Sequence, residues 1–341
     1  MAINLATKYS DEIASAFSRG SFIKGKTATT FDLTGVKTLK VYTPITVDEV
    51  DYVREGANRY GTPAEMQDIV QELTMTQDKA FTLTIDKGNN LDQNLVKRAA
   101  DMLRLQLNEK SAPAADRYAL RRFAHMAGTI AASDKPTTSN IISLIAAGMQ
   151  ALDDGLVPAD GRYLYVSSEI HKLICLSAEF IAVDALGAKS VAKGICGQVL
   201  GMEVVRVPER YMPENCWFLI THKDSVLMPY KIADAKVHED PVGVSGALIE
   251  GRHYYDAFVL GAKCAGVYAC VKTGYITAAP SNANGTLSCT DTGAVIRYTL
   301  DGSDPRYSDS AHDYAKPITV QSGETLKMFA CAAGKYPSVV V

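Results

Sequence analysis

The residues of this 341-residue chain that could carry out chemistry are scattered along it rather than clustered. Its six histidines stand far apart, at His125, His171, His222, His238, His253 and His312. The sequence contains no His-Glu-x-x-His, Gly-x-Ser-x-Gly or Gly-x-x-x-x-Gly-Lys motif, which would indicate a metal site, an activated serine or a phosphate-binding loop. We therefore expect no enzyme activity, no catalytic, cofactor-binding or metal-binding residues, and no cofactor.

Two groups of aspartates resemble functional sites but favour structural roles. The run Asp301–Asp304, with Asp309 nearby, could be taken for a calcium loop. It lacks the alternating oxygen ligands and the terminal glutamate of a hand-type site, so we predict a turn. Asp153 and Asp154 end a predicted helix, and we expect them to be solvated rather than to form an acid pair.

An aromatic group formed by Tyr254, Tyr255 and Phe258 could in principle present a sugar-binding platform. Neighbouring side chains of a strand point to opposite faces, so the tyrosine pair cannot build one flat surface. We therefore predict core and interface roles for these rings.

The composition describes an ordinary globular protein of a reducing compartment. Hydrophobic residues make up 47% and charged residues 21%, and the net charge of −3 argues against a whole-molecule electrostatic nucleic-acid binder. The seven cysteines are odd in number and form no Cys-x-x-Cys, which argues against a disulfide framework and a zinc site. The first residues do not have the pattern of a secretion signal and no apolar run is long enough to span a membrane, so we expect no membrane partner.

Residues 1–40 have the composition of an extended arm. They combine a short amphipathic segment, Lys8–Phe17, with a stretch rich in Gly and Thr. Six cationic residues stand against three acidic ones. This local excess is consistent with a solvated arm, or with an arm that lies across neighbouring subunits or faces packaged nucleic acid.

Strands and a long helix are predicted next. The predicted strands cover residues 41–43, 46–53, 70–76 and 80–86. The last of them alternates apolar and polar residues at the period of two. The polar segment Arg54–Glu65 is either an ordinary surface loop or a long protruding one. Helical spacing extends over residues 91–126, where Pro113 should break or kink the helix because it lacks an amide and clashes with the preceding turn.

A helix, a strand and a second helix follow. Thr137-Thr138-Ser139 offers an N-cap to a helix that runs through Leu152, and Tyr163–Val166 has the pattern of a strand. Ser167 or Ser168 then caps a further helix.

Residues 194–273 are a string of short apolar strands cut by Gly and Pro, with motifs in a distinctive order. The motifs are Gly-x-Val-x-Gly-x-x-Val at 197–204, Val207-Pro208, His222-Lys223-Asp224-Ser225-Val226, the run Gly251–Phe258 and a strand ending at Lys272. This order resembles the closing half of a tailed-bacteriophage major capsid protein of the Hong Kong 97 type.

The resemblance implies an α+β fold of the Hong Kong 97 capsid type over residues 1–277. Its parts would be an N-terminal arm (1–40), an extension-loop hairpin with peripheral strands (41–90), a spine helix (91–136), an axial domain (137–235) and a return to the peripheral domain (236–277). In this family the extension loop lies over an adjacent subunit. A protruding hairpin is only marginally stable by itself, so it should need a partner surface.

The remaining residues, 274–341, differ from the rest in composition and pattern. Residues 274–285 are a linker by composition, so few contacts should connect the parts on either side. Five short predicted strands follow, at 286–289, 295–299, 317–320, 325–332 and 338–341. This is the pattern of a small all-β sandwich. The runs Ile296–Pro305, Pro317-Ile318 and Leu326–Ala330 resemble the immunoglobulin-like C-terminal domain of chitobiases and β-hexosaminidases, an accessory module without catalytic residues. We place this second domain at residues 278–341.

Together the resemblances imply a major capsid protein that self-assembles into the icosahedral shell around a phage genome, with residues 278–341 displayed outside. The implied location is the virion capsid, assembled in the host cytoplasm. The implied partners are copies of the chain in hexamers and pentamers, scaffolding, portal and decoration proteins, packaged double-stranded DNA, and glycans contacted weakly through residues 278–341. Two alternatives stay open: an encapsulin-type protein nanocompartment shell, and a carbohydrate-active enzyme or adhesin suggested by the C-terminal domain.

Overall fold

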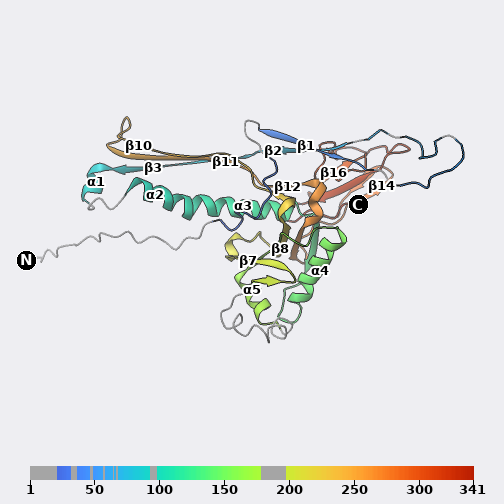
Figure 1. Ribbon diagram of the computed structural model, residues 1–341, viewed down its shortest axis with the longest axis horizontal. Helices are drawn as coiled ribbons and strands as arrows, with labels where there is room; N and C mark the ends of the chain where they lie inside the picture. Colours follow the sequence, from blue (N-terminus) through green and yellow to red (C-terminus); the bar gives the residue numbers. More distant parts are fainter. Residues whose placement is uncertain are drawn as a thin grey trace, which may run out of the picture.

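The structure is a computed structural model, and it describes residues 21–31, 37–46, 49–56, 58–63, 65–66, 68–92, 98–177 and 197–341. The predicted amphipathic segment Lys8–Phe17 lies outside them. Figure 1 shows an elongated upper layer with a wedge-shaped domain below it. In the described ranges, no helix is both long and apolar enough to cross a membrane.

One end of the upper layer is a hairpin that projects from the body of the chain (Figure 1). Strand β1 (Thr38–Pro44) pairs antiparallel with β2 (Asp68–Thr74), which confirms the two predicted outer strands. We call residues 45–67 the hairpin loop. The strand expected at Thr46–Val53 is wrong, because its described residues are not in a strand. Its described apolar side chains, Val50, Tyr52 and Val53, are exposed, and none of the strands in the described ranges lies beside it to complete a ladder.

The other end of the upper layer is a long three-stranded antiparallel sheet in the order β10-β11-β3. The strands are β3 (Gln77–Asp86), β10 (Tyr230–Glu239) and β11 (Gly246–Tyr255). Strand β3 contains the predicted strand at 80–86, and its Leu83 pairs with Ile249 of β11. Ten residues in each strand make this sheet about 33 Å long.

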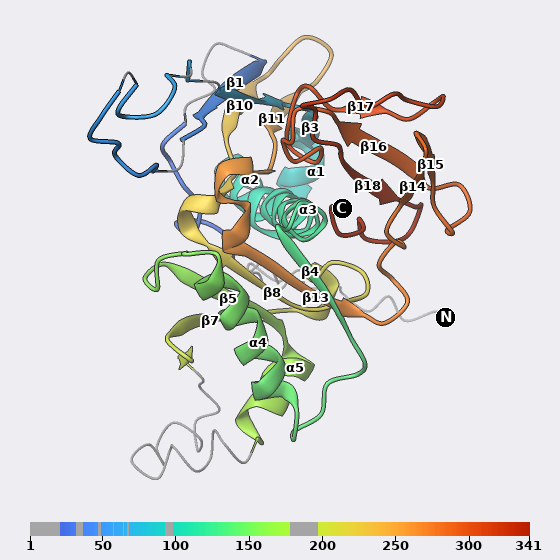
Figure 2. The same ribbon diagram turned by 90° about the vertical axis from the view of Figure 1, so that its right-hand side faces the viewer.

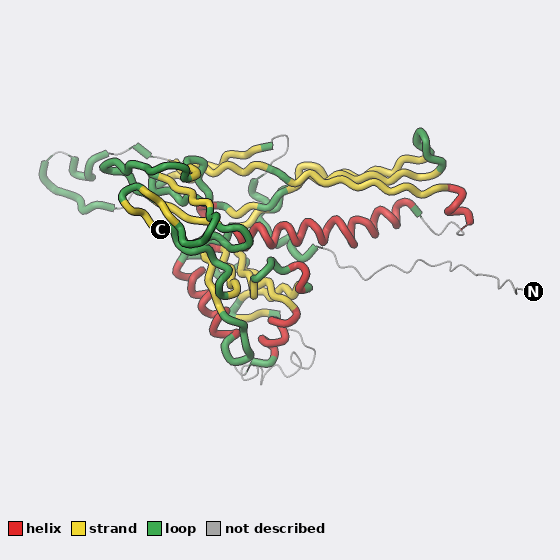
Figure 3. The backbone as a smooth tube through the Cα atoms, turned by 180° about the vertical axis from the view of Figure 1, so that it is seen from behind, coloured by secondary structure: helices red, strands yellow, loops and turns green. Residues whose placement is uncertain are grey.

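A long spine helix lies along the sheet (Figures 1 and 3). It comprises α2 (Ala99–Gln106), a π-helical segment (Leu107–Ser111) and α3 (Ala112–His125). The short helix α1 (Lys87–Asp92) precedes it at the tip of the sheet.

A break or kink was expected at Pro113, and the break is wrong, because the spine helix continues through the proline. The amide of Ala112 donates to the carbonyl of Leu107, five residues back. The hydrogen-bond ladder therefore changes its spacing immediately before the proline, and the proline falls in the first turn of α3, where a missing amide is tolerated.

The wedge below contains a six-stranded mixed sheet between two layers of helix (Figure 2). In spatial order the strands are β4 (Thr129–Ser133), β13 (Val267–Lys272), β8 (Cys216–His222), β5 (Arg162–Ser167), β7 (Met202–Val207) and β6 (Gln198–Val199). Side chains alternate between two cores along each strand. Leu164 joins the core beneath α4 (Ile141–Asp154) and α5 (Ser168–Cys175), whereas Tyr165 joins the core beneath α3.

The observed ends of these helices and strands agree only in part with those predicted from the sequence. The strand predicted at Tyr163–Val166 is confirmed, and the hydroxyl of Ser167 caps α5 by accepting a hydrogen bond from the amide of Ile170 at 3.3 Å. The N-cap expected at Thr137–Ser139 is wrong, since Asn140 occupies that position. Short connections are β9 (Val226–Leu227) paired with β12 (Phe258–Val259), and 3-10 turns at Glu209–Tyr211, Lys223–Ser225 and Gly261–Gly266.

The C-terminal residues form two small sheets. They contain β14 (Ser281–Ala283) with β15 (Thr286–Ser288), and β17 (His312–Asp313), β16 (Val295–Thr299) and β18 (Lys327–Cys331) in that spatial order. The expected strands at 317–320 and 338–341 are absent from this fully described region, although Ser338 and Val341 donate backbone hydrogen bonds to carbonyls of β18. The expected linker at 274–285 is wrong, because Thr277 and Pro280 are buried there and β14 lies within it.

Candidate functional site

The described residues bring no metal centre together. In those ranges no group of three or more His, Cys, Asp or Glu side chains could hold a metal ion. The histidines serve packing and hydrogen bonding instead. The ring of His222, for example, is buried and bonds the carbonyl of Asp160 at 2.8 Å and the amide of Asp224 at 3.2 Å.

The two aspartate groups occupy structural positions. The carboxylate of Asp301 accepts hydrogen bonds from the amide and hydroxyl of Ser303, at 3.0 and 2.5 Å, and from the hydroxyl of Ser310 at 2.7 Å. This is the predicted turn, held by side chains. Asp153 and Asp154 are both exposed, as predicted, and the carboxylate of Asp153 also lies 2.7 Å from the guanidinium of Arg162. That guanidinium side chain is 4% exposed, and a buried cation needs a counter-charge.

The aromatic group is part of the core, as predicted. Tyr255 and Phe258 are buried, and Tyr255 stacks on Tyr230 with ring centroids 5.4 Å apart. Tyr254 points the other way and donates its hydroxyl to the carbonyl of Met75 at 3.2 Å. The three rings therefore do not form a shared platform.

Asp256 is a junction residue that the sequence did not reveal. Its carboxylate is 1% exposed and accepts hydrogen bonds from the amide and hydroxyl of Thr76, from the hydroxyl of Tyr118 and from the amide of Ala257, all at 2.7–2.8 Å. It thereby ties the β2–β3 corner to the spine helix. A lone acid between aromatic strand residues was the signal available in the sequence.

Asp116 is a second buried junction residue, on the face of α3 that points away from solvent. Its carboxylate accepts hydrogen bonds from the hydroxyl of Ser21 and the amide of Phe22, both at 2.6 Å. Burial raises the pKa of Asp116, although these two hydrogen bonds act in the opposite direction. The residue holds the start of the described chain against the helix, and Phe22 and Ile23 enter the core beside it.

The hairpin loop carries a group of exposed apolar side chains. Together with the end of β1, it exposes Tyr42, Ile45, Val50, Tyr52, Val53, Tyr60 and Met66. Tyr60 is 86% exposed and meets Tyr52 edge-on, with ring centroids 5.0 Å apart. Exposed apolar groups of this density mark interaction sites.

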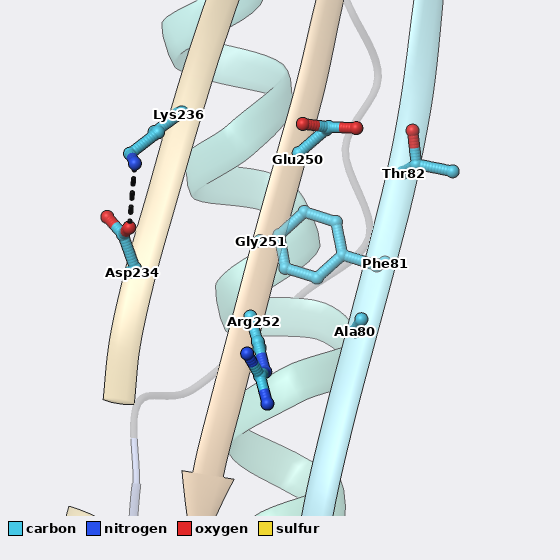
Figure 4. Close-up of a pocket in the computed structure, with 8 residues that line it drawn as sticks. All are labelled: Ala80, Phe81, Thr82, Asp234, Lys236, Glu250, Gly251 and Arg252. Atoms are coloured by element: carbon cyan, nitrogen blue, oxygen red, sulfur yellow. Dashed lines mark ion pairs between the residues drawn. The ribbon is translucent and has the colours of Figure 1, made fainter. Parts of the chain in front are cut away.

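The outer face of the long sheet carries a shallow groove of about 460 Å³ (Figure 4). The ring of Phe81 lies across Gly251 of the neighbouring strand, and a Cβ at Gly251 would come within 2.3 Å of that ring. Around this floor stand Ala80, Thr82, Asp234, Lys236, Glu250 and Arg252. The guanidinium of Arg252 forms two hydrogen bonds to Asp78, at 3.0 and 2.6 Å, and thereby lowers the pKa of that carboxyl.

A second groove, of about 520 Å³, lies between the sheet and the spine helix. Apolar and aromatic side chains dominate it, including Phe81, Tyr118 and Tyr255. The π-helical segment Leu107–Ser111 forms part of its wall. The sheet therefore has a groove rimmed by charged side chains on one face and an apolar groove on the other.

Comparisons with known proteins find similarities for both parts of the chain. Residues 274–341 match the family model of the chitobiase/beta-hexosaminidase C-terminal domain. No curated protein sequence matches.

Solved structures are similar over most of the chain. A structure titled "Mycobacterium phage Che8" covers 80% of this chain and 100% of its own, with 18% identity and a TM-score of 0.67. The capsid structure of the cyanophage P-SCSP1u covers 79% and 93%, with 12% identity and a TM-score of 0.67. The mature capsid of bacteriophage PhiM1 covers 80% and 93%, with 13% identity and a TM-score of 0.63. The chain thus has the expected mixed α+β fold of phage capsid chains, and it carries a C-terminal domain similar to that of chitobiases and β-hexosaminidases.

Proposed function

We propose that this chain is a major capsid protein whose copies assemble into the icosahedral shell that encloses a phage genome. The observation that carries the proposal is the exposed apolar hairpin loop, on a chain with the fold of phage capsid chains. A shell of many copies needs surfaces that recognise other copies, and it needs no catalytic centre.

The hairpin loop has the properties of a segment completed by another molecule. Its internal backbone hydrogen bonds are local, from Val53 to Arg59 and from Gly61 to Asn58. Such a hairpin is marginal alone, and burial of its tyrosines would stabilise a contact by about 25 cal/mol for each Å² removed from water. We propose that it lies over the long sheet of an adjacent subunit, where the groove at Phe81 offers an apolar floor with a charged rim.

The finer partners are proposals that follow from this function. Copies of the chain would form hexamers and pentamers, with double-stranded DNA inside the shell and scaffolding, portal and decoration proteins as further partners. The division at residue 277 or 278 stays a prediction, as does weak glycan contact through residues 278–341.

Experiment can distinguish two other functions from this one. An encapsulin-type compartment would share the shell and differ in its content, a cargo enzyme in place of DNA. The match of residues 274–341 to a domain of carbohydrate-active enzymes is the observation that favours a carbohydrate-active function. Turnover of a chromogenic hexosaminide that a single Asp or Glu substitution abolishes would establish that function and overturn a purely structural role.

Electron microscopy of the purified chain, with light scattering, tests the proposal. We expect regular hollow shells from the chain expressed alone or together with its scaffolding protein. The double variant Tyr52→Ser/Tyr60→Ser should remain a folded subunit that forms no shells. Tyr275→Ser, at an exposed tyrosine of the C-terminal domain, is the matched control and should still assemble. Unimpaired assembly of the double variant would contradict the role given to the loop.

A further inference from the structure

The C-terminal domain holds the end of the spine helix. The guanidinium of Arg306 donates hydrogen bonds to the carbonyls of Ala127 and Gly128, at 2.9 and 3.1 Å. The hydroxyl of Tyr307 donates to the carbonyl of Met126 at 2.7 Å. These carbonyls belong to the C-cap residue of α3, Met126, and to the two residues after it. The domain therefore fixes the segment that leaves the helix from a distant part of the chain.

Arg306 is fixed in the geometry that these contacts require. Its Nε and Nη2 atoms bond both carboxylate oxygens of Asp304, at 2.7–3.2 Å, which leaves Nη1 aimed at the helix end. The Arg306 side chain is 12% exposed. A cation at a helix C-terminus is stabilised by the helix dipole, and a planar guanidinium can serve a carboxylate and two carbonyls at once.

Two tyrosines of the domain complete the core of the rest of the chain. The ring of Tyr336 is 2% exposed and stacks on His125, the last residue of α3, with centroids 4.4 Å apart. Its hydroxyl donates to the carbonyl of Glu214 at 2.7 Å. Tyr307 packs in the same core and lies against Gly261, where an added Cβ would come within 2.7 Å of the tyrosine Cβ.

The same segment of the C-terminal domain also contacts the hairpin of strands β1 and β2, which we call the extension hairpin. The amide of Asp309 donates to the carbonyl of Val70 in β2 at 3.0 Å. The carboxylate of Asp309 pairs with the ammonium of Lys40 in β1 at 3.2 Å. Residues 304–309 thus contact the helix end and the hairpin base together. Figure 2 looks along the spine helix and shows the domain packed beside α3.

We propose that the C-terminal domain is a built-in clamp, in which residues 304–309 and Tyr336 fix the extension hairpin to the end of the spine helix. The expectation that few contacts connect this domain to the rest of the chain is wrong. The clamp acts within one subunit, so it does not depend on the proposed shell function. It gives the domain a structural role in addition to any display on an outer surface.

Hydrogen exchange of the full-length subunit tests the clamp. The double variant Arg306→Met/Tyr307→Phe keeps the volume of both side chains but removes three hydrogen bonds to the helix end. Peptides covering residues 121–128 should exchange at least about tenfold faster, because a hydrogen bond from a charged group contributes about 1.5 kcal/mol or more. Peptides covering β2 should also exchange faster, since the hairpin base contacts the same segment.

The matched control is Arg297→Met, which removes an ion pair to Asp313 within the C-terminal domain. It should leave exchange at residues 121–128 and in β2 unchanged. If the double variant does not fold, Tyr307→Phe alone removes one hydroxyl and should still raise exchange at residues 121–128 several-fold. Unchanged exchange at the helix end in these variants would overturn the clamp. A response at the helix end without one in β2 would overturn its link to the hairpin.

Discussion

The hairpin loop and the C-terminal domain both extend from the body of the subunit, but they place their aromatic side chains in opposite ways. Tyr52 and Tyr60 of the loop lie exposed and touch only each other among the aromatic contacts of the described residues. Tyr307 and Tyr336 of the domain are buried in the core beneath the spine helix. The rings of the loop are not packed against the described residues of the core, whereas those of the domain are packed inside it.

The polar contacts show the same difference. The hydrogen bonds of the hairpin loop are local, such as that from Arg59 to the carbonyl of Gly56. The domain also forms hydrogen bonds to distant residues, as from Arg306 to Ala127, 179 positions apart. A segment stabilised by distant parts of its own chain contributes to subunit stability, and one with local contacts alone contributes little. The free energy of unfolding of the free subunit therefore separates the two regions.

The largest expected effect comes from ending the chain after Thr277. This truncation removes two buried tyrosines, each worth about 3 kcal/mol, so the free subunit should lose roughly 6 kcal/mol or more. It also leaves the carbonyls at the end of α3 without Arg306. Thermal unfolding and solubility would measure the loss. A soluble 1–277 fragment with the transition temperature of the full chain would remove the contrast between the two regions.

The next effect concerns the root of the hairpin, which is anchored although its tip is not. Asp256→Ala should cost about 3 kcal/mol, because it leaves the buried amide of Ala257 and the half-buried hydroxyl of Tyr118 without their acceptor. Chemical denaturation would measure it. Asp78→Ala breaks the exposed pair with Arg252 and should cost less than about 1 kcal/mol. Equal costs for the two variants would contradict the anchoring role of Asp256.

The sequence predicted the elements whose pattern is local. Period-two alternation located β3, and a serine before an apolar run located the start of α5. The order of the strand motifs after Gly197 indicated the fold that the similar solved structures confirm. These features depend on neighbours in the chain, so the sequence displays them directly.

What the sequence did not predict depends on distant partners. The segment Thr46–Val53 has strand-forming residues, but no described strand lies beside it. Pro113 was expected to break or kink the helix, yet the spine helix continues through it directly after a π-helical segment. The stretch at 274–285 has the composition of a linker, although burial of Thr277 makes it part of a packed domain. The clamp was missed for the same reason, since Arg306 gives no sign in the sequence that its partner is Ala127.

A smaller effect should follow from acidification at the clamp. Burial lowers the pKa of His125 below its ordinary value of 6.5, as do the neighbouring cations Arg121 and Arg122, against the opposing charge of Glu214. The unfolded chain then binds the proton at a higher pH than the folded chain. Stability is therefore retained above about pH 6.5 and lost as the pH falls through the folded pKa, by at most about 1.4 kcal/mol per pH unit.

The variant His125→Phe isolates this contribution, because it keeps a ring against Tyr336 and removes the titration. Unfolding measured from pH 7.5, about one unit above the ordinary histidine pKa, down to pH 4.5, about two units below it, should show a shallower acid dependence than the parent. His238→Gln, at an exposed histidine paired with Glu250, is the control. Its unfolding should show the same acid dependence as that of the parent. Identical slopes for the parent and His125→Phe would remove His125 from the acid response.

The smallest effect on the free subunit should come from deleting Arg54–Glu65, the outer part of the hairpin loop. The deleted residues contribute no described side chain to the buried core, so the free energy of unfolding should change by less than about 0.5 kcal/mol. Shell formation, measured by electron microscopy, should nevertheless be lost, because the deletion removes Tyr60 and the turn that presents Tyr52. A deleted subunit without a thermal transition would show that the loop stabilises its own chain. The hairpin loop and the C-terminal domain would then differ in degree only, and the loop would no longer be a surface reserved for a neighbour.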